Sequence, residues 1–317
     1  MFFNTIERGV CAVPVSKSQT RYTIFFMIAL SFICALILSL LASALAKPQE
    51  IAKDLDRSKE MLISAQILNA VGYFQVRGQD GNYLPAKAQP GGWLKPSSQK
   101  VVASDSNVLA VYKTRITPFL VNEKGEESTF EKTGIDQAKY LADYKKSGYY
   151  HQPWKLIYKI FANPTKEEIE KNKKTKVEGY VIPVNGMGLW DAIYGYLAIR
   201  TDGNTVIGIS WYDQKETPGL GANISEPEWQ SQFPGKHIFQ ENADGKTNFE
   251  SAQLGITVVK GKVSEVLGNS PKAKSAVDGM AGATLTGNGV TDAYKDVLAA
   301  YRPFLMQVHQ ENETDKK

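Results

Sequence analysis

The sequence predicts an α+β domain carried on a single N-terminal transmembrane helix. Three observations lead to this fold class: an uncharged apolar run at residues 22–46, several β-rich runs after residue 176, and helical spacing of apolar residues over 290–301. Helices and strands that each bury one apolar face must pack against one another around a shared core. With 317 residues, the chain is long enough for one or two such domains.

Charge and cysteine content exclude several classes of protein. The net charge is only +4, and no basic stripe interleaved with aromatic residues indicates binding to nucleic acid. The two cysteines, Cys11 and Cys34, both precede residue 47, which leaves the main domain without a disulfide, a thiolate metal site or a cysteine nucleophile. The three histidines are far apart in the sequence, so we expect no metal site built mainly from imidazoles.

The apolar run at residues 22–46 predicts the transmembrane helix. It contains 25 residues without a charge, and about 20 apolar residues are enough to cross the hydrocarbon core. A cleaved signal peptide is the alternative, because Ala44-Leu45-Ala46 fits a cleavage site. The apolar region of a signal peptide is usually about 7–15 residues long, so the length favours an uncleaved anchor. Basic residues are nearly balanced on the two sides of the run, and charge alone leaves the orientation open.

Residues 47–176 are predicted to contain a stalk helix followed by a mixed region. Apolar residues at helical spacing over 51–71 indicate a helix that leaves the membrane, docks on the domain and ends at Gly72. In the mixed region, the VLAVY run within 107–116 predicts a strand, and residues 135–146 predict a helix. No motif with recognisable chemistry occurs in this region.

From residue 177 the β pattern becomes clearer. Residues 177–184 and 255–261 are predicted to be strands. The β-rich runs at 194–201 and 205–214 flank Asp202-Gly203-Asn204, and a short glycine-containing connection of this kind predicts a β-hairpin.

The chain is predicted to close with a helix over residues 290–301. Its apolar residues lie on one helical face, and Pro303 is expected to limit its extension, because proline lacks the N–H group that a helix needs. The predicted organisation is therefore a tail (1–21), a transmembrane helix (22–46), a stalk and docking helix (47–73), a divergent part of the extracytoplasmic domain (74–176), a core (177–310) and a polar tail (311–317).

Three glycine-rich segments are the candidates for ligand binding, because glycine lets the backbone approach a ligand closely. The segments are NGMGLWDAIYGY (185–196), KETPGLGANI (215–224) and DGMAGATLTGNGV (278–290). The predicted hairpin lies between the first two and can bring their ends together. No GxGxxG or GxxxxGK[ST] pattern is present, and GISWY around Ser210 lacks the second glycine of a nucleophile elbow.

The third segment has two interpretations. Thr284 and Thr286 precede the predicted start of the last helix, near Asn288 or Gly289. The free N–H groups and the partial positive charge of a helix N-terminus suit a phosphate group. Alternatively, Thr286 or Asn288 simply caps the helix, which is the interpretation that local physics alone favours.

The third segment also resembles a known motif. Residues 278–286, DGMAGATLT, are similar to the flavinylation motif D-x-x-[S/T]-G-A-T-x-[S/T] of the FMN-binding domain family. Ala281 departs from this motif, in which Ser or Thr is usual at that position. The departure removes a hydroxyl near the phosphate or near the modifying enzyme, but it leaves the acceptor threonine of the motif, which is Thr286 here.

Two further segments strengthen the resemblance. NGMGLW (185–190) and ETPGLG (216–221) occur in the same order in the C-subunit family of bacterial sodium-pumping NADH:quinone reductases. The anchor and the LDRSKEMLISA stretch after it are also similar to that family. Together the resemblance covers residues 20–70 and 177–310.

The resemblance implies one covalently bound FMN per chain. A flavin transferase would move FMN from FAD onto the Thr286 hydroxyl as a phosphoester, with Asp278 as part of the recognition motif. A threonine hydroxyl is a poor nucleophile without activation, and the sequence shows no base beside Thr286, in line with an external enzyme. The remaining predicted FMN contacts are Gly282, Ala283, Thr284, Leu285, Asn288, Glu216, Thr217, Gly219, Leu220, Gly221, Leu189 and Trp190, with Trp211 and Tyr212 packed near the ring.

The resemblance also implies a role and a location. The chain would relay electrons within a sodium-pumping NADH:quinone oxidoreductase of the bacterial inner membrane, without a catalytic residue or an NADH or quinone site of its own. Its N-terminus would be cytoplasmic and its main domain periplasmic. Two alternatives remain at this point: the G subunit of an Rnf-type electron-transport complex, and a membrane-anchored envelope binding or structural protein with a degenerate flavin motif.

Overall fold

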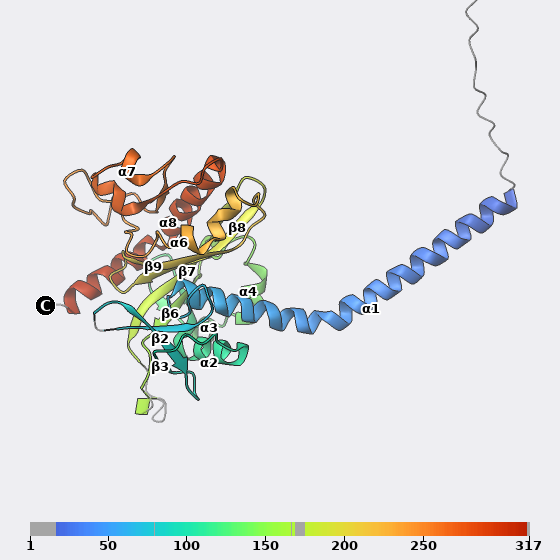
Figure 1. Cartoon of the computed structure of the whole chain (residues 1–317), viewed down its shortest axis with the longest axis horizontal. Coiled ribbons are helices and arrows are strands. Elements are labelled where there is room, and N and C mark those ends of the chain that lie inside the picture. The colour runs from blue at the N-terminus through green and yellow to red at the C-terminus, as the bar shows by residue number, and fades with distance from the viewer. Residues whose placement is uncertain (1–16, 79, 166, 169–174, 316–317) are drawn as a thin grey trace, which may run out of the picture. The chain divides into compact units, whose positions relative to one another are not determined.

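The structure is a computed structural model that describes residues 17–315, apart from residues 79, 166 and 169–174 (Figure 1). The chain divides into two compact units, residues 1–54 and 55–317. The described residues form helices and mainly antiparallel sheets, which confirms the predicted α+β fold class. The predicted cytoplasmic tail, up to residue 16, lies outside the described residues.

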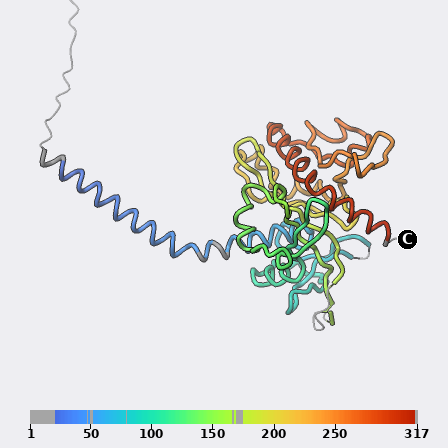
Figure 2. The backbone as a smooth tube through the Cα atoms, turned by 180° about the vertical axis from the view of Figure 1, so that it is seen from behind, coloured from blue at the N-terminus to red at the C-terminus, as the bar shows by residue number. Residues whose placement is uncertain are grey.

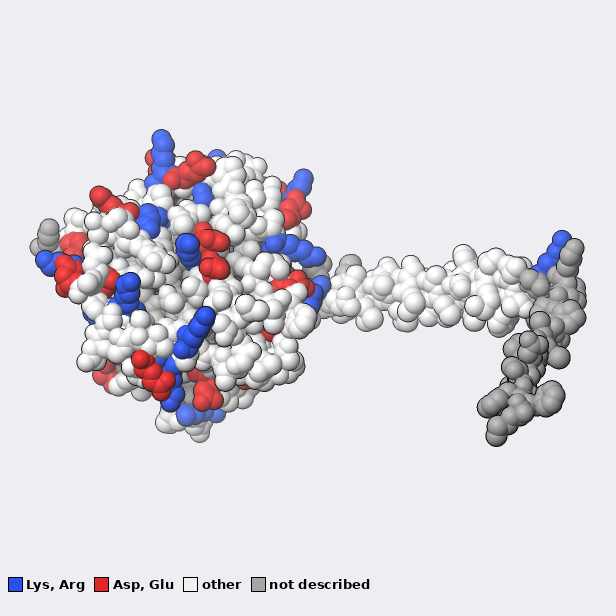
Figure 3. Space-filling model, turned by 90° about the horizontal axis from the view of Figure 1, so that it is seen from above, with Lys and Arg blue, Asp and Glu red and all other residues white. Residues whose placement is uncertain are grey.

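Helix α1 (Lys17–Ser64) contains the apolar run. Within the part of the chain that the structure describes, its segment 21–46 is the one stretch long and apolar enough to cross a membrane. The side chains of this segment are exposed in the isolated chain, and Figure 3 shows a long stretch of it without charged groups. An exposed surface of this composition is stable in contact with lipid. Pro48 lies inside α1 without ending it.

The end of α1 differs from the prediction, because the helix stops at Ser64 and not near Gly72. The Ser64 hydroxyl donates to the carbonyl of Met61 at 2.8 Å, and Gln66 has a positive φ of 57°. The chain then reverses, and Leu68 forms an antiparallel bridge with Phe74. The apolar pattern continues beyond Ser64 because Ile67 and Leu68 are also buried in the core. These two residues lie in the turn after the helix and not in the helix itself.

The centre of the second unit is an antiparallel sheet with the strand order β5-β4-β6-β7-β8-β9. Its strands are β4 (Ile116–Val121), β5 (Glu127–Ser128), β6 (Lys155–Phe161), β7 (Val177–Met187), β8 (Ala192–Arg200) and β9 (Val206–Asp213). The predicted β8–β9 hairpin is confirmed. Its turn contains Gly203 at a φ of 68°, and Oδ1 of Asp202 accepts hydrogen bonds from the N–H groups of Asn204 and Thr205 at 2.8 and 2.7 Å.

Both faces of this sheet are covered, as Figures 1 and 2 show. One face packs against the last helix, α8 (Thr284–Asp315), and its core includes Ile182 of β7 and Leu197 of β8. The other face packs against the end of α1, and its core includes Val181 and Ala198 from the same two strands. Neighbouring residues of a strand point to opposite faces, so burial on both sides explains the continuous apolar runs of β7 and β8.

Smaller elements complete the second unit. A sheet of β1 (Phe74–Arg77), β2 (Tyr83–Ala88) and β3 (Leu94–Pro96) lies on the α1 side with α2 (Asp105–Arg115). The remaining described elements are α3 (Phe130–Thr133), α4 (Gln137–Asp143), η1 (Tyr149–His151), η2 (Gly221–Ser225), α6 (Pro227–Gln230), β10 (Thr257–Val258), α7 (Val263–Val266), η3 (Pro271–Ser275) and β11 (Ala276–Val277). The prediction of a helix within 135–146 is confirmed by α4, and the predicted strand 255–261 shortens to β10.

The predicted strand within 107–116 is wrong, because these residues form helix α2. The Ser104 side chain accepts from the N–H of Asn107 and caps the helix. Val108 and Val111 are both buried and lie on one helical face. The cap and this buried face outweigh the β preference of the valines. A strand does follow, but it begins at Ile116.

Helix α8 is longer than predicted at both ends, since it begins at Thr284 and passes through Pro303 to Asp315. A proline inside a helix costs about 3 kcal/mol. Phe304 and Leu305 are nevertheless buried in the core. The guanidinium of Arg302 donates to the carbonyl oxygens of Phe249, Glu250 and Ala252 at 2.6–3.2 Å. These tertiary contacts hold the helix together beyond the proline.

Candidate functional site

The glycine-rich stretch 278–290 forms a turn and then the first turns of α8. Gly282 has a φ of 73°, and the N–H of Ala283 donates to the carbonyl of Met280 at 3.1 Å. The helix begins at Thr284, so Thr286 and Asn288 lie inside it and neither is its cap. The capping interpretation of these two residues is therefore wrong.

The hydroxyl of Thr286 is buried and donates a hydrogen bond to Oε2 of Glu216. Thr286 is 1% exposed and Glu216 is 5% exposed. The other carboxylate oxygen, Oε1, accepts from the N–H of Trp190 at 3.0 Å. The structure thus joins the second and third glycine-rich segments through two residues that are 70 positions apart in the chain, and the bond to Trp190 ties both segments to the first.

The environment keeps Glu216 ionised. Burial acts to raise the pKa of this carboxyl, but hydrogen bonds from the Thr286 hydroxyl and from the backbone of residues 189–191 lower it further than burial raises it. The net result is a pKa below the ordinary value. At neutral pH the Thr286 hydroxyl therefore faces a carboxylate. The expectation of no base beside Thr286 considered only its neighbours in the sequence, whereas Glu216 comes from a distant segment.

Two glycines make this contact possible. A Cβ on Gly221 would overlap Oγ1 of Thr286, and a Cβ on Gly188 would overlap Oε1 of Glu216. Because any larger residue at these positions would push the partners apart, the glycines of NGMGLW and ETPGLG have a steric role.

Four exposed apolar side chains belong to the same three glycine-rich segments or their junction with α8, and we call them the apolar rim: Leu189, Trp190, Leu220 and Leu285. Trp190 is 67% exposed, and its indole N–H donates to Oγ1 of Thr217 at 3.0 Å. Leu220 also lies next to Gly282, whose Cβ would stand 3.0 Å from a Leu220 methyl group. The rim therefore brings together the β7–β8 connection, the loop after β9 and the start of α8.

Two predicted ring contacts lie away from the rim. Trp211 is buried in the core under α8, where its indole N–H donates to the Tyr294 hydroxyl at 3.1 Å. Tyr212 stacks on Tyr196, with ring centroids 4.9 Å apart, against the core on the α1 side of the sheet. Both residues belong to the interior of the fold.

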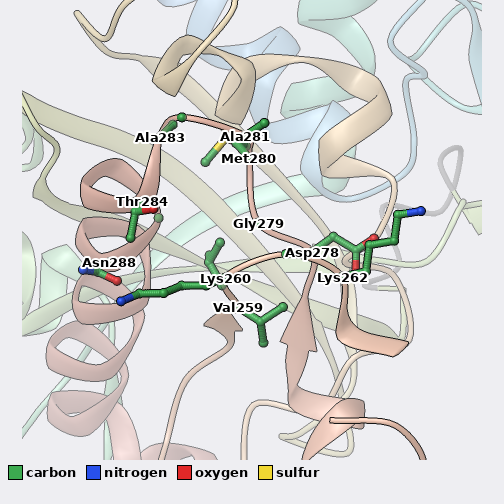
Figure 4. Close-up of a pocket in the computed structure, with 14 residues that line it drawn as sticks. Val259, Lys260, Lys262, Asp278, Gly279, Met280, Ala281, Ala283, Thr284 and Asn288 are labelled. Carbon is green, nitrogen blue, oxygen red and sulfur yellow. The ribbon is translucent and has the colours of Figure 1, made fainter. Parts of the chain in front are cut away.

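A separate cavity of about 360 Å³ lies beside the same turn (Figure 4). Asp278, Gly282, Ala283, Thr284 and Asn288 line it, together with residues 258–262, whereas Thr286 does not. In Figure 4 the Lys260 side chain extends towards Asn288. The predicted site residues therefore divide into a group around Thr286 and a group at this cavity.

Asp278 links loops. Its Oδ1 accepts from the N–H of Val263, the first residue of α7, at 2.7 Å. Its backbone carbonyl accepts from the indole of Trp229 at 2.9 Å, and its N–H donates to the Gln232 side chain at 2.8 Å. Ala281, the departure from the motif, is exposed, so no buried partner is lost at that position.

Comparison with known proteins identifies the family. The sequence profile of the FMN-binding domain matches residues 188–299. The C subunit of the Na(+)-translocating NADH-quinone reductase from Chlamydia caviae is 40% identical over 94% of this chain and 95% of its own length. The chain belongs to the C-subunit family of Na(+)-translocating NADH-quinone reductases. The relative from Pasteurella multocida is 30% identical over 92% of this chain and 96% of its own length.

A solved structure agrees with this family, and a second one shares the fold. The relative from Parabacteroides distasonis, also a C subunit, has a TM-score of 0.50 at 26% identity, and covers 82% of this chain and 96% of its own length. The Shewanella oneidensis protein has a TM-score of 0.51 at 22% identity, over 81% and 98%, and shows the fold alone. Membership in the C-subunit family decides between the two electron-transport families that the motifs left open.

Proposed function

We propose that the chain carries FMN through a phosphoester on Thr286 and relays electrons inside a sodium-pumping NADH:quinone reductase. The observation that carries this proposal is the hydroxyl of Thr286, buried against a carboxylate at the start of α8, in segments that also present the exposed apolar rim. The match of residues 188–299 to the FMN-binding domain supports the choice of flavin. The other polypeptides of the same membrane complex are the proposed partners.

The residues around Thr286 fit such a group. The first turn of α8 provides free N–H groups and a partial positive charge for a phosphate. The apolar rim offers exposed leucines and an indole to a flat, largely apolar ring. Gly221 lets the backbone of its loop lie close to Thr286, because a Cβ at this position would overlap Oγ1. Glu216, Thr217 and Gly219 supply polar or backbone contacts on the same loop.

FMN supplies the one- and two-electron chemistry when it is bound, and the chain supplies position and retention. A covalent bond at Thr286 keeps the cofactor on the chain at any free concentration, whereas a non-covalent cofactor is held by mass action. Retention matters on the outer side of the membrane, where we propose that the second unit lies. No NADH or quinone site is part of this proposal.

The test is covalent labelling. The full chain is coexpressed with a flavin transferase, run on a denaturing gel and inspected for flavin fluorescence. We expect a fluorescent band for the wild type, none for Thr286→Val, and a band for Thr284→Val, because Thr284 is exposed and Thr286 has the carboxylate partner. A fluorescent Thr286→Val chain contradicts the attachment site. A wild type without fluorescence contradicts the covalent flavin itself.

A further inference from the structure

The hydrogen bond between Thr286 and Glu216 joins the proposed attachment point of FMN to a carboxylate. Thr286 is the attachment point, and its Oγ1 must lose a proton to form an ester. Oε2 of Glu216 accepts the hydrogen bond of that same proton. The acceptor of the proton is therefore already in contact with it in the unmodified chain.

The backbone fixes the carboxylate in this position. Oε1 of Glu216 accepts from the N–H of Trp190, in a turn closed by a hydrogen bond of 2.8 Å from the Gly188 N–H to the Asp191 carbonyl. The N–H of Glu216 donates to the Gln214 side chain at 2.6 Å. One carboxylate oxygen is thus held by the β7–β8 connection, and the other faces Thr286.

From this geometry we infer that Glu216 accepts the Thr286 proton during flavin attachment, an inference that rests on the proposed function. Oγ1 of Thr286 forms a bond to the FMN phosphorus of FAD, and the bond from that phosphorus to the pyrophosphate bridging oxygen breaks. AMP leaves with the bridging oxygen and its electron pair. The proton of Thr286 passes to Oε2 of Glu216, and no atom is oxidised or reduced.

A carboxylate suits this task. Threonine is a weak nucleophile unless a neighbouring base takes its proton. Protein kinases use an aspartate in the same sense, to accept the proton of a substrate hydroxyl during phosphoryl transfer. The acceptor chain thus contributes the base, and the transferase contributes the binding of FAD.

The first test replaces Glu216 by glutamine. Purified full-length chain, FAD and a flavin transferase are mixed, and covalent flavin is followed by in-gel fluorescence and by the mass of the labelled peptide. We expect Glu216→Gln to lower kcat for attachment by about 100-fold, at the lower end of general-base effects, with KM for the chain within about threefold. Glu228→Gln is the matched control, since this carboxylate is exposed on the short helix α6.

The second test is chemical rescue. In Glu216→Ala, added formate should restore part of the attachment rate, whereas formamide, which has the same shape but is not a base, should restore none. A purely structural role for Glu216 predicts equal effects of the two compounds. Thermal melting of each variant checks that it is folded.

Two results overturn the inference: a folded Glu216→Gln chain labelled on Thr286 at the wild-type kcat, or rescue by formamide equal to rescue by formate. Failure of the proposed function looks different. In that case the wild-type chain acquires no covalent flavin, or the labelled peptide carries its flavin on a residue other than Thr286.

Discussion

Thr284 and Thr286 stand two residues apart at the start of α8 and have opposite environments. Thr284 is exposed and lines the cavity of Figure 4, whereas Thr286 is buried against Glu216. From the sequence, only the resemblance separated the two threonines. The contact with Glu216 could not be predicted, because it spans 70 residues and no local pattern encodes a pairing of that length.

The close packing at Gly221 leads to a testable prediction about a single residue. In Gly221→Ala the added methyl group would overlap Oγ1 of Thr286, so the hydroxyl or the loop must shift. We expect slower flavin attachment and a loss of about 1–3 kcal/mol of stability, as for overpacked interiors. Attachment is measured by in-gel fluorescence, and stability by urea unfolding.

Ala222→Ser is the control for Gly221→Ala. It changes the adjacent, half-buried position and should alter neither measurement by more than a small amount. Attachment and stability at wild-type levels in Gly221→Ala would show that the close approach of the loop to Thr286 is unimportant.

Among the elements, local signals predicted the β8–β9 hairpin but not α2 or the length of α8. The hairpin follows from turn chemistry at Asp202 and Gly203, which is encoded within a few residues. The continuation of α8 past Pro303 depends on the distant carbonyls that Arg302 binds. Such contacts override propensity and are invisible in a local window.

Arg302 therefore carries a prediction for α8. Its guanidinium binds three carbonyl oxygens of residues 249–252 and lies 5.6 Å from the centre of the Phe239 ring. Arg302→Ala should destabilise the second unit by about 1–3 kcal/mol, because these carbonyls lose a charged donor. Urea unfolding measures the effect, with the exposed Lys295→Ala on the same helix as control. Equal unfolding midpoints for the two variants would show that the hydrogen bonds of Arg302 do not stabilise α8.

The end of α1 carries a pH-dependent prediction through Glu60. Burial raises the pKa of Glu60, while a hydrogen bond from the Ser210 hydroxyl opposes the rise. The folded chain thus binds this proton more tightly than the unfolded chain, and its stability falls as pH rises through the unfolded and then the folded pKa. Glu60→Gln should raise Tm at about pH 8, by about 2–4 °C for each kcal/mol gained.

The gain from Glu60→Gln should disappear near pH 3, well below the ordinary carboxyl pKa of 4.5, where Glu60 is protonated in both states. Melting curves of the full chain in detergent at the two pH values test this. Glu131→Gln, at an exposed carboxylate, is the control. A destabilised Glu60→Gln chain at pH 8 would show that the charge itself holds α1 to the sheet.

At the scale of the whole molecule, the anchor and the α+β domain were both predictable, because each rests on composition and periodicity over many residues. Orientation was not, since the flanking basic residues are nearly balanced. Basic and acidic side chains are also interspersed on the face of the second unit seen in Figure 3. Neither the charges beside the membrane span nor those on the surface of the second unit therefore indicate the orientation of the chain in the membrane.

The proposed orientation has a direct test. After Cys11 and Cys34 are replaced by serine, Lys246→Cys introduces a single thiol at an exposed loop of the second unit. A membrane-impermeant maleimide should label this thiol in intact spheroplasts, because the unit is proposed to face the periplasm. The cysteine-free chain is the control. Labelling only after lysis would place the unit on the cytoplasmic side.

The hydrogen bond from Thr286 to Glu216 can exist only before the proposed attachment of FMN, which we call maturation. A phosphoester oxygen has no proton to donate, so attachment removes a donor from Glu216 and adds an anion beside it. The mature chain must then bring in water, reorient Glu216 or bind a proton there. The proposed attachment and proton binding are thus thermodynamically linked: a chain that carries the phosphoester binds a proton at Glu216 more readily than a chain without it.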